Sequence, residues 1–135
     1  MRRFDLTRKD FSYSYNVATR WKDMDSYGHV NNATYLTYFE DARVVMINKW
    51  KLKPKSLIVA SIKVDYLKQI KHPAKLEVWA KVSKVGGSSF DILSYIFEEG
   101  KDTPLAASTI VVVCFDYKKQ KPLRVFPQIL KEVEI

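Results

Sequence analysis

The sequence predicts an α+β fold in which an antiparallel sheet wraps around one long buried helix. One segment, from about residue 32 to residue 50, has apolar residues at helical spacing. Segments with strand-like alternation precede and follow it, and short turns join most of them, which favours antiparallel neighbours. The 135 residues are 47% hydrophobic and 28% charged, a globular balance. We therefore expect residues 1–135 to form a single domain with one core.

Residues 11–20 predict the first strand. Tyr13, Tyr15, Val17 and Thr19 alternate with more polar residues and fall on one face. Residues 22–28 follow as a loop, since Asp, Ser and Gly are typical turn residues.

The helix comes next, with a main apolar stripe at three- to four-residue spacing. Its members are Tyr35, Phe39, Ala42, Met46 and Trp50. Further apolar residues widen this stripe around most of the circumference, so we expect burial on nearly all sides. Asn31 or Asn32 can cap the start of the helix, and Pro54 ends it.

The rest of the chain predicts four strands and a short amphipathic end, which could be helical. The expected strands are residues 58–67, 76–83, 90–97 and 106–115. Gly86 and Gly87 indicate a hairpin between the second and third of these. The last strand is continuously apolar, which is typical of a central strand covered on both faces.

The formal charge of +8 favours an anionic partner. The basic residues are scattered, however, and their densest clusters, residues 49–55 and 118–121, read as loops. No nucleic-acid motif fits them, so we expect a basic surface rather than a nucleic-acid groove.

Several other classes are disfavoured. The longest apolar run, residues 110–115, is too short for a membrane span, and no secretory signal is visible. The single Cys114 and the two histidines predict neither an internal disulfide nor a metal site. Cys114 lies in an apolar strand and should be a core thiol in a cytoplasmic protein.

The chemistry concentrates just before the helix. Two carboxylates, a histidine and two asparagines lie within residues 23–32. The first N–H groups of a helix have no partner inside it, and the macrodipole adds partial positive charge there. Such an end can polarise a carbonyl, and a carboxylate a few residues upstream can attack that carbonyl or activate a water.

This segment resembles the hotdog-fold acyl-CoA thioesterases of the 4-hydroxybenzoyl-CoA thioesterase-like superfamily. The matching residues are Asp23-Met24-Asp25, Gly28-His29-Val30-Asn31-Asn32, Tyr35-Leu36, Tyr38-Phe39-Glu40 and Ala42-Arg43. The detailed resemblance covers residues 17–47, and the order of strands agrees over the remainder. It implies a hotdog fold and hydrolysis of a medium- to long-chain acyl-CoA to free acid and CoA without a cofactor. It further implies a homodimer or homotetramer.

The resemblance also implies roles for individual residues. Asp25 would be the nucleophile or the general base, and the backbone N–H of Asn32 would polarise the thioester carbonyl. His29 would orient water or the carbonyl, although a histidine at a helix start can instead be satisfied by backbone groups. Gly28 would allow close approach of the substrate, with Tyr27 and Asn31 beside it.

Two further carboxylates have mainly structural interpretations. Asp23 would order the loop or pair with Arg20. Glu40 competes with Asp25 because another branch of hotdog thioesterases uses a helix carboxylate, but an ion pair with Arg43 three residues away is favoured.

The sequence is compatible with more than one substrate. Lys84 is a candidate for contact with the CoA phosphates, since relatives bind them near this hairpin, but the hairpin itself has no basic residue. Two alternatives are an acyl-carrier-protein thioesterase and a non-catalytic acyl-CoA-binding module. In the carrier-protein enzymes an Asn stands where this chain has Tyr27.

Overall fold

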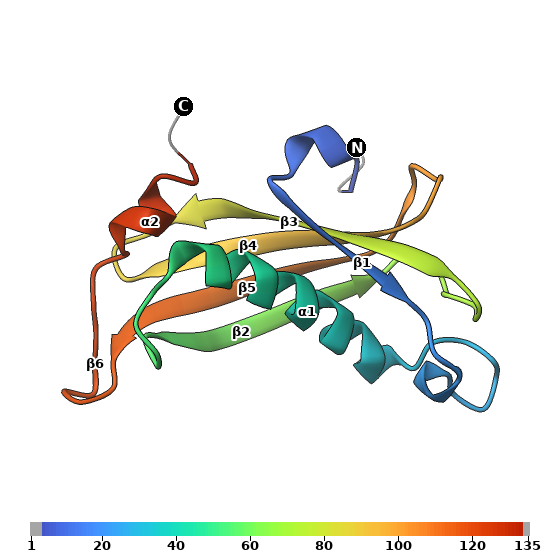
Figure 1. Ribbon diagram of the computed structural model, residues 1–135, viewed down its shortest axis with the longest axis horizontal. Coiled ribbons are helices and arrows are strands. Elements are labelled where there is room, and N and C mark those ends of the chain that lie inside the picture. The colour runs from blue at the N-terminus through green and yellow to red at the C-terminus, as the bar shows by residue number, and fades with distance from the viewer. Residues whose placement is uncertain (1–3, 134–135) are drawn as a thin grey trace.

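The computed structural model describes residues 4–133, in which a curled antiparallel sheet wraps around helix α1 (Asn32–Trp50) (Figure 1). The strands are β1 (Tyr13–Ala18), β2 (Leu57–Tyr66), β3 (Lys75–Val85), β4 (Ser89–Glu98), β5 (Pro104–Asp116) and β6 (Lys121–Pro122). Their order is β1-β3-β4-β5-β2, and β6 pairs with β5. The short helices are η1 (Arg8–Asp10), η2 (Trp21–Asp23) and α2 (Pro127–Leu130). This architecture confirms the predicted α+β class.

The predicted elements are all present, with ends that differ by a few residues. β5 lies between β4 and β2, as expected of a central strand. Its first half is buried on both faces, whereas its second half is fully buried only on the face that carries Ile110, Val112 and Cys114. The predicted core position of the Cys114 side chain is therefore confirmed, and burial raises the pKa of its thiol.

The larger part of the core lies between α1 and the concave face of the sheet. Tyr35, Tyr38 and Phe39 on the first turns of α1 pack in one cluster with side chains of β3, β4 and β5. Met46 and Trp50 on the last turns pack in a second cluster towards α2. Removing this apolar surface from water fixes α1 across the sheet.

One expectation about α1 is wrong for the chain by itself. The predicted stripe is buried, but Leu36 and Val44 on other sides of the helix are 40% and 47% exposed. The reason is geometric, because the sheet of one chain curls around only one side of the helix (Figure 1).

The strand β2 forms one edge of the sheet and exposes apolar residues. Val59, Ile62 and Tyr66 are each more than 40% exposed. An edge strand of ten residues with unpaired backbone groups and apolar side chains is a template for pairing with another strand.

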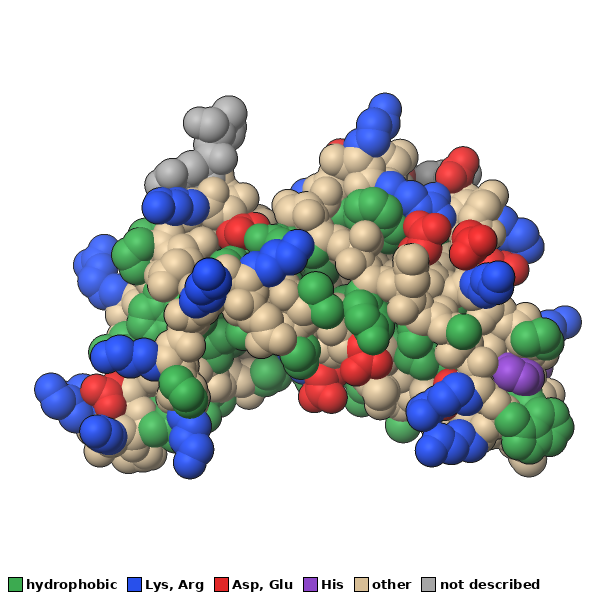
Figure 2. All heavy atoms as spheres, viewed as in Figure 1, with side chains coloured by type: hydrophobic (Ala, Val, Ile, Leu, Met, Phe, Trp, Pro, Cys, Tyr) green, Lys and Arg blue, Asp and Glu red, His purple; other side chains and the backbone are tan. Residues whose placement is uncertain are grey.

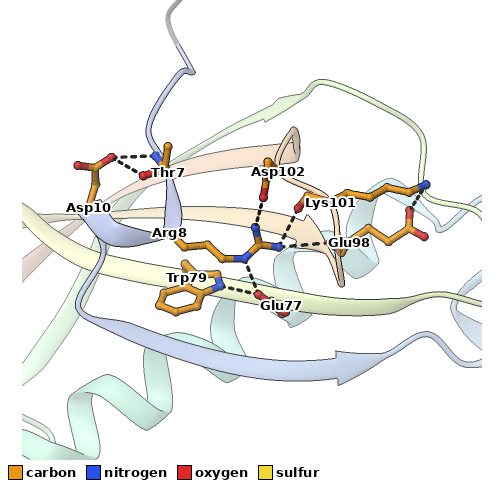
Figure 3. Close-up of polar contacts among 8 residues, drawn as sticks. All are labelled: Thr7, Arg8, Asp10, Glu77, Trp79, Glu98, Lys101 and Asp102. Atoms are coloured by element: carbon orange, nitrogen blue, oxygen red, sulfur yellow. Dashed lines mark hydrogen bonds and ion pairs between the residues drawn. The ribbon is translucent and has the colours of Figure 1, made fainter.

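A cluster around Arg8 ties the N-terminal segment to the sheet (Figure 3). Its guanidinium donates to Glu77 at 2.7 Å, to Asp102 at 3.0 Å and to the carbonyl of Lys101 at 2.8 Å. It also lies 4.4 Å from the centre of the Phe97 ring. No pattern in the sequence predicts this cluster, since its members are up to 94 residues apart. None of the described helices is both long and apolar enough to cross a bilayer.

Candidate active site

The loop before α1 is folded back on itself by backbone hydrogen bonds. The N–H of Asp25 donates to the carbonyl of His29 at 2.7 Å, and the N–H of Asn31 donates to the carbonyl of Asp23 at 2.8 Å. Gly28 takes a φ of 80°, which lies in the left-handed region that glycine adopts without strain. The loop therefore has a defined path that ends at the first residue of the helix.

Asp25 is half-buried and has one oxygen engaged. Its Oδ1 accepts the backbone N–H groups of Tyr27 at 2.8 Å and of His29 at 3.2 Å. Among residues 4–133, Oδ2 has no hydrogen-bond partner. The carboxylate is thus held by one oxygen while the other is available for chemistry.

Asp23, two residues earlier, has a different environment. It is 2% exposed and accepts hydrogen bonds from the Tyr38 hydroxyl at 2.7 Å and from the backbone and guanidinium of Arg20. Burial alone would raise the pKa of Asp23, but the hydrogen bonds from Tyr38 and Arg20 outweigh it and hold the pKa below its usual value. The interpretation of Asp23 as a loop-ordering carboxylate paired with Arg20 is confirmed.

The start of α1 distinguishes the two asparagines. The side chain of Asn31 is the cap, because its Oδ1 accepts the N–H of Ala33 at 2.9 Å. Asn32 is the first helical residue, and its backbone N–H finds no acceptor within the described part of the chain. That N–H is the donor that a substrate oxygen could use.

Asp25, His29 and Asn32 line one cavity of about 320 Å³. The backbone of His29 is hydrogen-bonded, whereas its ring has no hydrogen-bond partner in the described chain. The structure therefore brings the three residues predicted to be catalytic to one place, and the volume falls within the range of small-molecule sites.

Other predicted residues lie outside this cavity. Tyr27 is 84% exposed, Asn31 is used as the cap, and Gly28 shapes the loop. Lys84 lies in β3 next to the hairpin and lines neither this cavity nor the second one described below.

Another wall of the cavity comes from the end of β2 and the loop that follows it, and sequence reasoning missed it. It consists of Tyr66, Leu67, Lys68 and Gln69. The Tyr66 hydroxyl donates to the carbonyl of Asn32 at 2.9 Å, and its ring meets that of Tyr35 edge-on. These residues are more than 30 positions from Asn32, so only the packing of β2 against α1 places them here.

A second cavity of about 280 Å³ lies further along α1, against β2 and β5. Its lining residues are Leu36, Thr37, Phe39, Glu40, Arg43, Ile62, Ser108 and Ile110. The predicted Glu40–Arg43 pair is present at 3.7 Å, and burial lowers the pKa of the Arg43 guanidinium. Glu40 does not line the Asp25 cavity, and it lies about 12 Å along the helix from Asn32.

Metal ligands are not gathered anywhere in the described chain. Within residues 4–133, no group of three His, Cys, Asp or Glu side chains could hold a metal ion.

Comparison with known proteins identifies the family. The model of the thioesterase-like superfamily matches residues 19–133. YsmA of Bacillus subtilis is 32% identical over 114 residues, which cover 82% of this chain and 77% of that protein. The acyl-CoA thioesterase YbgC of Haemophilus influenzae is 29% identical over 133 residues, which cover 90% and 93% of the two chains.

A solved structure extends the comparison to three dimensions. A Thermus thermophilus thioesterase, crystallised with coenzyme A and Zn, superposes with a TM-score of 0.77 at 27% identity, covering 93% of this chain and 99% of that chain. Because the family model spans most of the sequence and the sheet and helix superpose on a solved thioesterase, the chain belongs to the thioesterase-like superfamily and is a thioester hydrolase of the hotdog fold.

Proposed function

We propose that the chain hydrolyses a medium- to long-chain fatty acyl-CoA to the free acid and CoA in the cytoplasm, at the cavity that Asp25 lines. One observation carries the proposal: Asp25 and Asn32 line the same cavity, and among residues 4–133 neither Oδ2 of Asp25 nor the N–H of Asn32 has a hydrogen-bond partner. The coenzyme A bound to the Thermus thermophilus relative supports CoA as the carrier of the acyl group.

The geometry supports two routes through Asp25. In the first, Asp25 takes a proton from a water whose oxygen bonds to the thioester carbon. The C–S bond then breaks, and CoA leaves with that proton. In the second, Asp25 itself attacks the carbon, CoA leaves, and water cleaves the resulting anhydride. In both routes the Asn32 N–H and the dipole of α1 stabilise the negative carbonyl oxygen.

The acyl chain would bind in an apolar cavity next to the reacting group. The second cavity lies about one to three helical turns further along α1, and Leu36, Phe39 and Ile62 supply apolar walls. Its position along the helix and its apolar walls support a fatty acyl group. Glu40 and Arg43 neutralise one another at its edge.

A second copy of the chain completes the enzyme in this proposal. The exposed apolar residues of β2 and of α1 support assembly through this side of the molecule, into a homodimer or a tetramer of such dimers. The hotdog domain formed by residues 1–135 would then act as the subunit.

The test measures free thiol released by the full-length protein from acyl-CoA thioesters of increasing chain length. The same acyl groups are offered on acyl-carrier protein and on pantetheine. We expect acyl-CoA to give the highest kcat/KM. A clear preference for the carrier-protein thioester would favour that alternative substrate, whereas binding of acyl-CoA without thiol release would favour a non-catalytic binding module.

A further inference from the structure

A basic cavity lies at the opposite end of α1 from Asp25. It has a volume of about 690 Å³, roughly twice that of the Asp25 cavity, and forms where the loop between α1 and β2 meets the hairpin between β5 and β6. Four lysines line it: Lys51, Lys53, Lys55 and Lys118. Figure 2 shows Lys and Arg side chains gathered at this end of the molecule.

The charges of this cavity are largely uncompensated. Within the described chain none of the four lysines makes an ion pair. Among the described residues, Asp116 is the one carboxylate of the lining, and its Oδ1 accepts the N–H groups of Lys118 and Lys119. Four ammonium groups against one carboxylate favour a ligand with several negative charges.

The cavity also has aromatic walls. Phe115, Tyr117 and Phe126 line it, and the rings of Phe115 and Tyr117 lie 5.3 Å apart. Aromatic faces bind planar rings, and lysines bind phosphates, so the combination suits a phosphorylated nucleotide. By contrast, the hairpin at Gly86 and Gly87 offers no basic residue, and Lys84 does not line this cavity.

Within one chain this cavity is remote from Asp25, because α1 separates them by about 28 Å. The edge strand β2 changes that relation between two copies. β2 begins beside the lysine cavity at Leu57 and ends beside the Asp25 cavity at Tyr66 (Figure 1). If two β2 strands pair antiparallel about their midpoint, Leu57 of the partner subunit lies opposite Tyr66.

We propose that the lysine cavity of one subunit binds the phosphorylated nucleotide end of the acyl-CoA whose thioester lies at Asp25 of the other subunit. This inference rests on the proposed function and names the residues that would recognise CoA. Antiparallel pairing of β2 brings Lys55 of the partner subunit next to Leu67 and Lys68, at the rim of the Asp25 cavity. The active site is then complete only in the dimer.

The first test reverses two charges of the cavity. We expect the Lys53→Glu/Lys55→Glu variant to lose at least about tenfold in kcat/KM for acyl-CoA, mainly through KM. The loss should be absent with acyl-pantetheine, which has no nucleotide. The matched control, Lys9→Glu/Lys101→Glu, makes the same change of net charge on the side of the molecule near Arg8 and should behave like the wild type.

The second test asks which subunit supplies the lysines. Co-expression of Asp25→Asn chains with Lys53→Glu/Lys55→Glu chains places one intact Asp25 and one intact lysine cavity on different subunits of each mixed dimer. If these act together, about a quarter of all sites are intact by random pairing, and about a quarter of wild-type activity returns at low acyl-CoA concentration. If each chain uses its own lysines, mixing restores nothing.

The outcomes separate this inference from the proposed function. A wild-type protein that cleaves neither acyl-CoA nor acyl-pantetheine contradicts the proposed function. A wild-type protein that cleaves acyl-CoA, with equal losses for both substrates in the charge-reversed variant or with no gain on mixing, overturns the inference alone. A greater loss in Lys84→Glu than in the cavity variant would move the phosphate contacts to the hairpin and also overturn it.

Discussion

At its first turn α1 faces the Asp25 carboxylate and offers the N–H of Asn32, which has no acceptor among residues 4–133. By contrast, three lysines that follow its last turn and Lys118 of the hairpin between β5 and β6 surround a larger cavity. Hydrolysis at the first end depends on a few groups at fixed distances, and the loop before α1 and the first residues of the helix supply most of them. The second end needs only positive charge and flat apolar walls, which three separate segments can supply. The groups for precise chemistry thus lie in one segment, whereas the basic cavity joins lysine clusters that lie more than 60 positions apart in the sequence.

The largest effect is expected at the first end. We expect Asp25→Asn to lower kcat by at least about a hundredfold, because groups acting as base or nucleophile contribute at least that much. Asn keeps an oxygen that can accept the N–H groups of Tyr27 and His29, so the melting temperature should stay near that of the wild type. Steady-state turnover of acyl-CoA and thermal unfolding measure the two quantities.

Asp10→Asn is the matched control, since Asp10 also accepts a backbone N–H at a turn, but far from the cavity. Its turnover should equal that of the wild type. Normal turnover in Asp25→Asn would remove Asp25 from the mechanism, and a loss in Glu40→Gln would then give the role to the helix carboxylate.

The neighbouring Asp23 should matter for stability instead. We expect Asp23→Asn to lower the free energy of unfolding by about 2 kcal/mol at neutral pH. The buried carboxylate accepts hydrogen bonds from Tyr38 and Arg20, and the amide that replaces it has only one oxygen to accept them and carries no charge. Urea unfolding measures this loss. A value within 0.5 kcal/mol of the wild type, a margin of about the size typical of surface changes, would contradict the structural role.

The stability of the wild type and of Asp23→Asn should also depend differently on pH. The pKa of Asp23 is lower in the folded state, so its contribution to stability is present above the unfolded pKa of about 3.9 and is lost as the pH falls through the folded pKa. The wild type should therefore lose its advantage over Asp23→Asn below about pH 4. An advantage that persists in strong acid would mean that the carboxylate charge is not its source.

In the proposed dimer, pairing of the β2 strands brings the Asp25 cavity of one subunit next to the lysine cavity of the other. A substitution on this edge strand should therefore lower activity even where the residue lines neither cavity. We expect Val59→Lys to shift the protein to a monomer and to lower kcat/KM for acyl-CoA about tenfold, because pairing of β2 about its midpoint would place an unpaired ammonium opposite Val64 of the partner subunit. Light scattering and turnover at micromolar concentration are the measurements. Tyr15→Lys on the other edge should leave the assembly intact, and a fully active Val59→Lys monomer would refute the shared site.

The smallest effect is expected from salt. Raising the salt from about 0.1 M to about 1 M shortens the screening length from about 10 Å to about 3 Å. We expect the KM for acyl-CoA to rise about threefold, while the KM for acyl-pantetheine stays constant, because only the nucleotide end meets the lysines. If the KM values of the two substrates respond equally to salt, the positive charge of the protein does not contribute to CoA binding.

The sequence determined the elements of the fold and one side of the site. Helical and strand periodicity identified α1 and the long strands, because each pattern is local. Asp25, His29 and Asn32 were recognised together because they lie within eight residues of one loop and one helix start. Their proximity in space follows from proximity in the chain.

Only the tertiary structure decided the rest. The placement of Tyr66 beside Asn32, the exposed apolar edge of β2, the cluster of Arg8 with Glu77 and Asp102, and the joining of residues 51–56 with residues 115–118 all depend on strand order and register. Residues on neighbouring strands meet because backbone hydrogen bonds fix the register. The spacing of side chains along one strand does not indicate which strand pairs with it or in which register. For the same reason the apolar circumference of α1 correctly predicted a helix but overestimated its burial, since the curl of the sheet alone decides which sides it covers.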